Sequence, residues 1–416
     1  MRAPQSTVGV LTLASLLFAS GGSSLLAQQR GGSRLEQPTA PGWVFTPGFS
    51  VAETWDSNVL LAGEGSDLSE DFLTVFTPRG ALGYRGRRTT LQFDYVGSYQ
   101  LYQQLSELNT FDQRSNAAFR HRLTPGLTMF FANSFSKSPT TAEIELPGVE
   151  FRRQGVMMDD VRTGFDARLS KRTTLNAAYS YQWVEFDDAP ELLPANGLTR
   201  GGHAHGVSTR LERSLTSRVS LGGEYDLRRG IVDEINEFDV QNALGTVDWR
   251  LSERLQLSAG AGMSWLTAND TRQSAPAFRA GLSGTGQRFG WNVGYRRAFL
   301  PSYGFGGTFE NQEFSAGFLA LLTRRLDWSS SLSYRVNDPL SRTTITVVGA
   351  DGSVVQTDLS LESLWLRSSL SFLATRWMRV EGFYASAVQD SQRAGGKVNR
   401  SRLGIQVVTS TRMRVR

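Results

Sequence analysis

The chain contains no cysteine, only three histidines and no apolar run approaching twenty residues. The missing cysteine excludes disulfides, thiol catalysis and cysteine metal sites. The lack of a long apolar run predicts that no helix crosses a membrane, because a spanning helix needs about 20 apolar residues. Lys and Arg total 44 against 39 Asp and Glu, but the basic residues alternate with acids and do not cluster. We therefore expect no nucleic-acid partner.

The N-terminus has the features of an export signal. A basic residue precedes a short apolar run from Val8 to Ala19, and small residues lead up to Ala27. We therefore expect residues 1–27 to be a secretory signal peptide. Residues 28–42 are rich in Gly, Ser, Gln and Pro, which predicts a flexible periplasmic segment. The folded domain is then expected over residues 43–416.

Residues 168–186 contain the unit from which the rest of the chain is built. Their side chains alternate strictly around a polar centre at Ser170–Arg172. One face carries Leu175, Ala177, Tyr179, Tyr181 and Trp183, and the other carries Thr174, Asn176, Ala178, Ser180 and Gln182. Period-two alternation of this length predicts two β-strands joined by a tight turn. A long apolar face opposite a polar face is typical of a lipid-facing wall around a polar lumen.

The same hairpin recurs along the whole chain. Short polar turns lie at residues 86–88, 124–126, 170–172, 216–218, 252–254, 286–288, 323–325 and 374–376. Longer segments separate the hairpins, the longest at 56–71, 136–154, 187–198 and 337–358. Short turns that alternate with long loops are the topology of bacterial outer-membrane barrels, whose short turns are periplasmic.

Eight short turns imply sixteen strands. One more strand is expected at each end of the domain, over Phe45–Trp55 and Arg402–Met413. The sequence therefore predicts an all-β, antiparallel, up-and-down transmembrane barrel of about eighteen strands, with sixteen as the alternative. A soluble β-sandwich is disfavoured because its strands are typically about five or six residues long, roughly half the length found here.

The polar faces of the expected strands are rich in arginine. The candidate lumen-lining residues are Arg114, Arg120, Arg122, Asp160, Arg162, Asp166, Arg168, Arg210, Glu224, Asp226, Arg228, Arg250, Arg279, Arg335, Arg367 and Arg379. Such residues can serve a purely structural purpose, as pairs of arginine and acid that hold a wide wall together. Alternatively they form a mildly basic lining for anionic or hydroxyl-rich solutes, since guanidinium groups bind carboxylates and phosphates. Segments 136–154 and 337–358 are candidates for a loop that folds into the lumen.

Other candidate sites are weaker. His203 and His205 lie on one face of a strand, but no nucleophile or third ligand accompanies them. We therefore expect no catalytic site, no metal centre and no cofactor. The acidic segment with Glu64 and Asp67 leaves calcium binding open. Asp56-Ser57-Asn58 fits an Asx turn at the end of a strand.

The stretch FTPGFSVAETWDSNVLLAG, residues 45–63, resembles the start of the porin 2-like family of outer-membrane β-barrels. First strands in that family often end in an Asp-x-Asn motif, here Asp56-Ser57-Asn58. A Thr-Pro pair begins the second strand, here Thr77-Pro78. The resemblance implies an outer-membrane porin, associated in some relatives with exopolysaccharide export. The C-terminus departs from the usual barrel pattern, because Met413–Arg416 ends without an aromatic residue.

The function expected from these observations is an aqueous, porin-like conduit in the outer membrane. The expected partners are lipid and lipopolysaccharide, the barrel-assembly machinery, and a polysaccharide or small anionic solutes. A structural or adhesive barrel with a plugged lumen is the alternative, and a barrel enzyme is less favoured.

Overall fold

The computed structural model describes residues 41–65, 68–143, 149, 151–187, 201–232, 236–268, 271–303, 307–340, 345–348, 354–357, 360–391, 396–411 and 413–415. The expected signal peptide and Asp67 lie outside these residues. Two short 3₁₀ helices are present, η1 (Ser106–Leu108) and η2 (Thr141–Glu143). Within the described part of the chain, no helix has the length and apolar content needed to cross a membrane.

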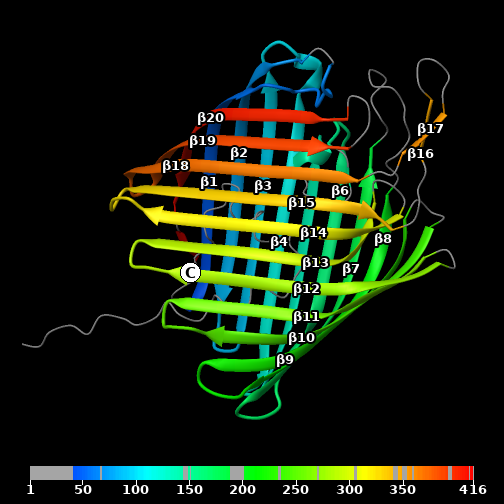
Figure 1. Cartoon of the computed structure of the whole chain (residues 1–416). Coiled ribbons are helices and arrows are strands. Elements are labelled where there is room, and N and C mark those ends of the chain that lie inside the picture. The colour runs from blue at the N-terminus through cyan, green and yellow to red at the C-terminus, as the bar shows by residue number, and fades with distance from the viewer. Residues whose placement is uncertain are drawn as a thin grey trace, which may run out of the picture. The chain divides into compact units, whose positions relative to one another are not determined.

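Long antiparallel strands form a closed barrel, and those of the front and back walls cross steeply in projection (Figure 1). In order they are β1 (Gly42–Asp56), β2 (Asp71–Arg85), β3 (Thr89–Tyr102), β4 (Thr110–Thr124), β5 (Leu127–Ser138), β6 (Val156–Arg168), β7 (Thr173–Phe186), β8 (Gly202–Ser214), β9 (Val219–Val232), β10 (Asn236–Arg250), β11 (Leu255–Ala268), β12 (Thr271–Thr285), β13 (Phe289–Ser302), β14 (Gly307–Leu321), β15 (Leu326–Pro339), β18 (Leu361–Thr375), β19 (Met378–Asp390) and β20 (Val398–Ser410). A short hairpin, β16 (Ile345–Val348) and β17 (Val354–Thr357), lies between β15 and β18.

The barrel closes between its first and last strands. β20 pairs with β1, and β21 (Met413–Val415) continues that pairing along β1. Because β20 and β21 occupy one position, the wall has eighteen strands, which confirms the predicted number. The terminal strands are slightly longer than expected, and the last one is described as β20, which ends at Ser410, and β21, which begins at Met413.

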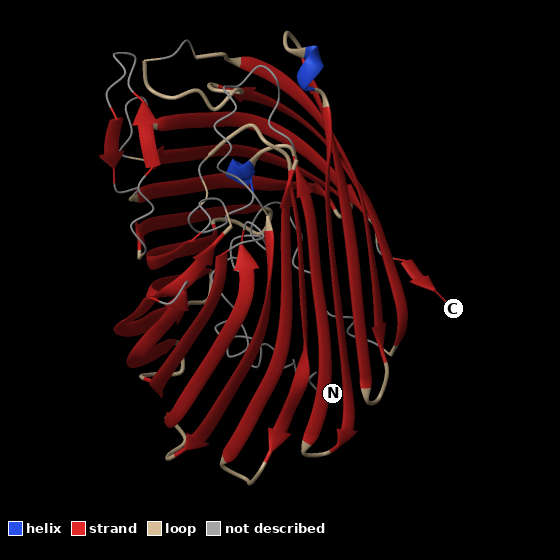
Figure 2. Cartoon of the chain, turned by 90° about the vertical axis from the view of Figure 1, so that its right-hand side faces the viewer, coloured by secondary structure: helices blue, strands red, loops and turns tan. Residues whose placement is uncertain are grey.

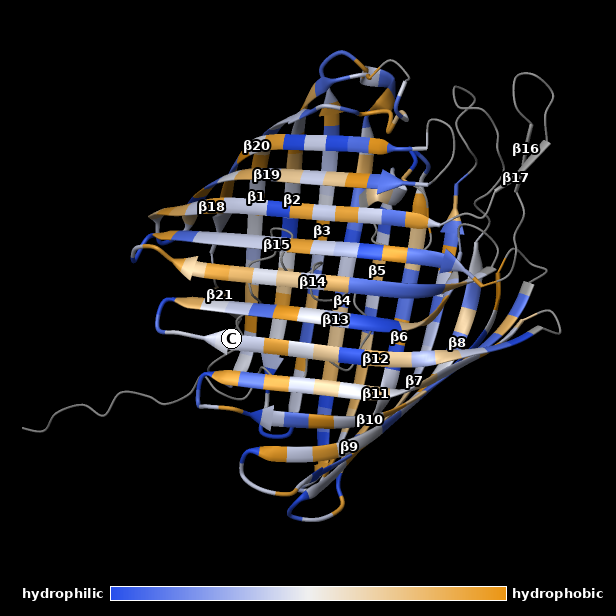
Figure 3. Ribbon diagram, in the orientation of Figure 1, coloured by the Kyte–Doolittle hydropathy of each residue, from blue (hydrophilic) through white to orange (hydrophobic). Residues whose placement is uncertain are grey.

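The outer face of the wall is apolar along the strands. Tyr179, Val207 and Leu211 are exposed, whereas Arg210, one residue before Leu211, is only partly accessible. Apolar and polar residues alternate along most strands, as Figure 3 shows by the change of colour from residue to residue. A closed barrel whose exposed outer face is apolar is suited to lipid, so this is a bacterial outer-membrane barrel.

Six outward tyrosines mark one boundary of this apolar face. Each bonds through its hydroxyl group to a side chain on the next strand, two residues nearer the long-loop end. The pairs are Tyr95–Gln113, Tyr179–His205, Tyr225–Gln241, Tyr295–Gln312, Tyr334–Glu362 and Tyr384–Ser401. Tyrosines with an apolar ring and a polar tip are typical of the membrane–water interface.

At the short-turn end of the barrel, a repeated main-chain hydrogen bond links each hairpin to the next. The turns lie together in Figure 2. In seven of the eight turns, the carbonyl of the last residue accepts an amide hydrogen from the end of the next long strand, and at the eighth turn Trp377, one residue farther on, does so. Examples are Arg172, bonded by Ser214, and Arg218, bonded by Arg250. Arg288, bonded by Leu321, repeats the contact farther round the rim. The eight hairpins are therefore joined into one continuous rim.

The long-loop end is not continuous. β12 and β13 pair only from Phe278↔Arg297 to Thr285↔Gly290, whereas the other neighbouring pairs run along most of their length. Beyond that point residues 298–302 of β13 stay paired with β14 and turn inward. Phe299 and Tyr303 there pack with Val240 of β10. The wall thus has an unpaired seam between residues 271–277 and β13.

Candidate functional site: the lumen and the segment that crosses it

Ion pairs between non-adjacent strands identify the inner face of the wall. Glu224 on β9 accepts two hydrogen bonds, at 2.8 and 2.9 Å, from Arg279 on β12. β10 and β11 lie between these strands, so the two backbones are about 14 Å apart along the wall. Side chains can close that distance only on the concave side. Glu224 and Arg279 therefore point into the barrel.

The same patch of inner wall contains a dense charge network. Arg210 on β8 contacts Glu224 at 2.9 Å and Asp248 on β10 at 2.6 Å. It also lies 3.5 Å from Glu212 on its own strand. Each acid here is shared between cations or lies beside one, so little net charge remains in this patch. The network joins β8, β9, β10 and β12 into one stiff section of wall.

Most of the other predicted lining residues also have partners. The remaining ion pairs are Arg114–Asp112, Arg120–Asp166, Arg228–Asp226, Arg335–Glu313, Arg367–Glu381 and Arg379–Asp327. Arg162 donates to Ser208 Oγ at 3.5 Å, across β7, and Asp160 lies two residues before it. These contacts are what a structural lining of paired charges requires.

Three predicted lining residues differ from the others. Arg122, Arg168 and Arg250 have no acidic partner within the described part of the chain. All three lie in the last residues of their strands, close to the short turns. They follow the same alternation as the inward Arg120, Asp166 and Asp248. The short-turn end of the inner face therefore carries uncompensated positive charge.

Several inward arginines stack on aromatic rings. The guanidinium groups of Arg120 and Arg162 lie 5.6 and 5.8 Å from the centre of the Phe130 ring, which is buried between them. The ring lies over Gly164, where an added Cβ would be only 2.9 Å from Phe130 Cζ. Arg335 stacks on Trp365 at 5.0 Å. Sequence analysis missed these inward aromatics, because aromatic residues in such strands usually face lipid.

The connection between β5 and β6 reaches a distant part of the wall. The amide of Phe151 donates to Gln389 Oε1 on β19 at 2.6 Å, and Gln389 Nε2 donates to the Val149 carbonyl at 3.0 Å. The Phe151 ring meets Trp365 on β18 edge-on at 5.1 Å. Along the shorter way round, β4, β3, β2, β1 and β20 separate β5 from β19. The segment therefore crosses the lumen. One candidate constriction segment thus folds inward, and its Glu145 and Glu150 lie outside the described residues.

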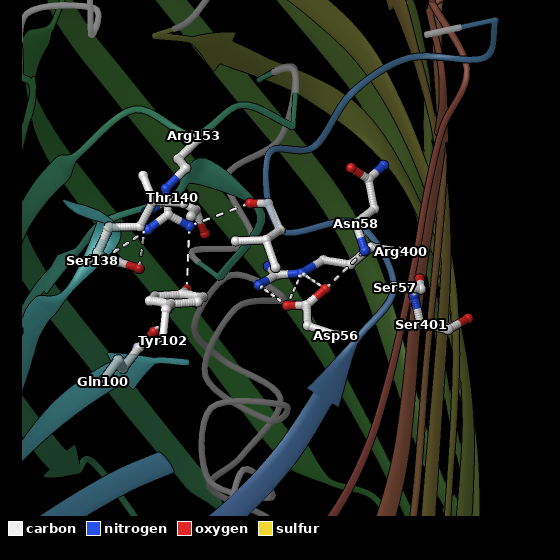
Figure 4. A network of polar contacts seen from close by, with 12 residues as sticks. Asp56, Ser57, Asn58, Gln100, Tyr102, Ser138, Thr140, Arg153, Arg400 and Ser401 are labelled. Carbon is white, nitrogen blue, oxygen red and sulfur yellow. Dashed lines mark hydrogen bonds and ion pairs between the residues drawn. The ribbon is translucent and has the colours of Figure 1, made fainter. Parts of the chain in front are cut away.

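Arg153 fixes this crossing segment two residues after Phe151. Its guanidinium donates to the carbonyls of Val59 at 3.3 Å and Leu108 at 2.9 Å, and to Tyr102 Oη at 3.2 Å (Figure 4). It also stacks on the Tyr102 ring at 4.9 Å. Arg153 is buried, so these contacts replace water for a full positive charge. The contacts of residues 149–151 and of Arg153 therefore fix the C-terminal part of the segment.

The predicted Asx turn is part of a larger clasp at barrel closure. The backbone amide of Asn58 donates to Asp56 Oδ1 at 3.1 Å, as expected for an Asx turn. The Asp56 carboxylate also accepts hydrogen bonds through Oδ2 from Arg400 Nε and Nη2 on β20, at 2.8 and 2.5 Å (Figure 4). Both side chains are almost completely buried. Ser57 and Ser401 exchange two further hydrogen bonds across the same seam.

The histidine pair is not part of the lumen. His203 and His205 alternate with the buried Ala204 and lie on the tyrosine-bearing outer face. His205 Nδ1 bonds the Tyr179 hydroxyl at 2.6 Å. Within the described residues, no group of three His, Asp or Glu is arranged to hold a metal ion. The pair therefore belongs to the interfacial belt of the outer wall.

No family model and no curated protein matches the chain. Membership of the porin 2-like family thus stays a prediction. Among solved structures, Pseudomonas aeruginosa OpdO has a TM-score of 0.45 at 13% identity, covering 89% of this chain and 98% of its own. Pseudomonas aeruginosa OccK2 (OpdF) in complex with glucuronate gives 0.45 at 12%, with 88% and 98% covered. Pseudomonas aeruginosa OpdK with vanillate gives 0.40 at 11%, with 88% and 99% covered.

Proposed function

We propose that this protein is a porin-like conduit of the outer membrane that favours small anionic solutes. The observation that carries the proposal is the charge of the inner face. Most lumenal acids are neutralised by arginines, whereas Arg122, Arg168 and Arg250 have no acidic partner among the described residues. An anion that enters at the short-turn end meets positive charge, and the preference is weak because salt screens it.

The dimensions of the wall support a conduit. Eighteen strands enclose a space wider than their own side chains fill, so water is expected inside. The crossing segment narrows this space and is held by Arg153 and Gln389. A small solute can pass beside a fixed segment. An exopolysaccharide, the more specific cargo expected from the family resemblance, would require the segment to move aside.

Transport is favoured over catalysis. The histidine pair that offered the best catalytic candidate faces outward, next to Tyr179. Most inward acids are engaged with arginines, and a general base or nucleophile needs a free, positioned group. A structural or adhesive barrel with a plugged lumen is the remaining alternative.

Swelling of proteoliposomes tests the proposed solute class. We expect a sugar acid to enter faster than the neutral sugar of the same size. Replacing Arg122, Arg168 and Arg250 together by Gln should remove that preference and keep entry of the neutral sugar. Arg229→Gln is the matched control, because Arg229 is exposed on the outer face. Equal rates for the two sugars in the unmodified protein contradict the anion preference, and no swelling with either sugar favours the plugged barrel.

A further inference from the structure

The rim of short turns is strongly basic. Its exposed cations are Arg87, Arg88, Lys171, Arg172, Arg218, Arg254, Arg288, Arg324, Arg325 and Arg376. Glu253 is the single acid in these eight turns. Within the described residues, no ion pair involves any of these ten cations. Because the side chains of these cations form no ion pair with the wall, their positive charge is available to an external anion.

One place on this rim forms a shallow recess that is largely open to solvent. Ser170, Lys171, Arg172, Thr173 and Arg213 line a space of about 570 Å³ at the turn between β6 and β7. Arg213 comes from β8, where it lies opposite Thr173. Three cations from two separate segments therefore surround one space.

The recess opens on the lipid side of the wall. Arg213 lies two residues after Leu211 and so shares its face of β8, the outer face, on which Leu211 is 47% exposed. Leu169 and Leu215, which flank the neighbouring turns, are 59% and 46% exposed. A cationic recess directly beside exposed leucines has the two chemistries of a phospholipid, an anionic headgroup and apolar chains. A free phosphate ion would use only the first of them.

We propose that this recess, the rim site, binds the phosphate headgroup of an anionic glycerophospholipid in the leaflet next to the short turns. Lys171 supplies a compact charge, and Arg172 and Arg213 supply planar donors suited to phosphate oxygens. The acyl chains lie along Leu169, Leu211 and Leu215. The proposal depends on the barrel and its orientation in the membrane and is independent of what the lumen conducts.

Native mass spectrometry of the purified full-length protein tests the rim site. The detergent-solubilised barrel is titrated with phosphatidylglycerol and separately with phosphatidylcholine. We expect tighter retention of the anionic lipid. Replacing Lys171, Arg172 and Arg213 together by Gln should weaken it on the order of 100-fold, at roughly fivefold per cation. Retention unchanged by this triple replacement would overturn the rim site.

Two further variants separate specific from general effects. Arg87→Gln with Arg88→Gln and Arg325→Gln removes three rim cations elsewhere and should leave phosphatidylglycerol retention nearly unchanged. Equal weakening by both triple variants would show diffuse attraction by the rim and contradict a defined site. Leu211→Ser with Leu215→Ser should weaken phosphatidylglycerol retention. An unchanged affinity there, with displacement of the lipid by millimolar inorganic phosphate, would show a simple anion site and contradict lipid binding.

These variants are compared only if they fold. Heat-dependent mobility on a gel reports the closed barrel for each of them, because a folded barrel migrates differently from the heated chain. Ion selectivity in bilayers provides the last distinction. If the rim cations act on the permeating solute in place of lipid, the first triple variant changes selectivity without changing lipid retention, and the proposal fails.

Discussion

The clasp between Asp56 and Arg400 offers a direct test of how the barrel is closed. Asp56→Ala leaves the Arg400 guanidinium without its carboxylate in a site where its side chain is only 3% exposed. Removing one partner of a buried ion pair costs about 3–5 kcal/mol, because the remaining charge is uncompensated. We expect Asp56→Ala to lower the free energy of unfolding by that amount, a change of roughly two to four orders of magnitude in the folded-to-unfolded ratio.

The assay is equilibrium unfolding in lipid vesicles followed by tryptophan fluorescence. Replacing both partners, as Asp56→Leu with Arg400→Met, should restore much of the lost stability, since no charge is then left buried. Glu64→Gln is the matched control, because Glu64 and Lys397 form an exposed pair at 4.0 Å near the same seam. That change should cost at most about 1 kcal/mol. If Asp56→Ala costs no more than Glu64→Gln, the buried clasp does not stabilise closure.

Three further predictions follow from the wall and the crossing segment. Gln389→Ala should free the segment from β19 and raise single-channel conductance, whereas Gln406→Ala, which loses a bond to Ser50 within the wall, should not. Ala177→Arg should impair assembly by about 2–4 kcal/mol because it faces lipid, and Ser180→Arg should be tolerated in the lumen, as scored by heat-dependent mobility. Amides of residues 271–277 that face the seam should exchange hydrogen faster than those of 278–285, by mass spectrometry of peptides.

Each of these predictions has an outcome that contradicts it. Unchanged conductance in Gln389→Ala means that the segment does not limit flow. Equal tolerance of arginine at positions 177 and 180 means that the inner and outer faces are wrongly assigned. Uniform protection along β12 means that the seam is paired in the membrane.

The strands, turns and faces could be predicted from the sequence because they depend on local periodicity. Alternation along β7 places Tyr179 outward and Ser180 inward without knowledge of any partner. The expected short turns are all present between consecutive strands. Sixteen of the eighteen strands follow from the hairpin repeat, since each of the eight short turns joins two long strands, and alternation at each end of the domain predicts one more.

The contacts inside the barrel could not be predicted, because they join residues far apart in the sequence. Asp56 and Arg400 are 344 positions apart, and Phe151 meets Gln389 across 238. Glu313, which pairs with Arg335, was missed because the two residues are brought opposite each other by the register between β14 and β15. The short pairing between β12 and β13 could not be predicted for the same reason. How far two strands pair depends on what packs behind them, here Phe299.

The central claim is that this barrel is an open conduit whose inner charge favours anions. The direct measurement is the current through the purified protein in a planar bilayer under a potassium chloride gradient. The account predicts discrete conductance steps and a reversal potential shifted modestly toward the chloride equilibrium potential. Absence of steps at every voltage would contradict the conduit, and a shift toward the potassium equilibrium potential would contradict the assigned charge of the lumen.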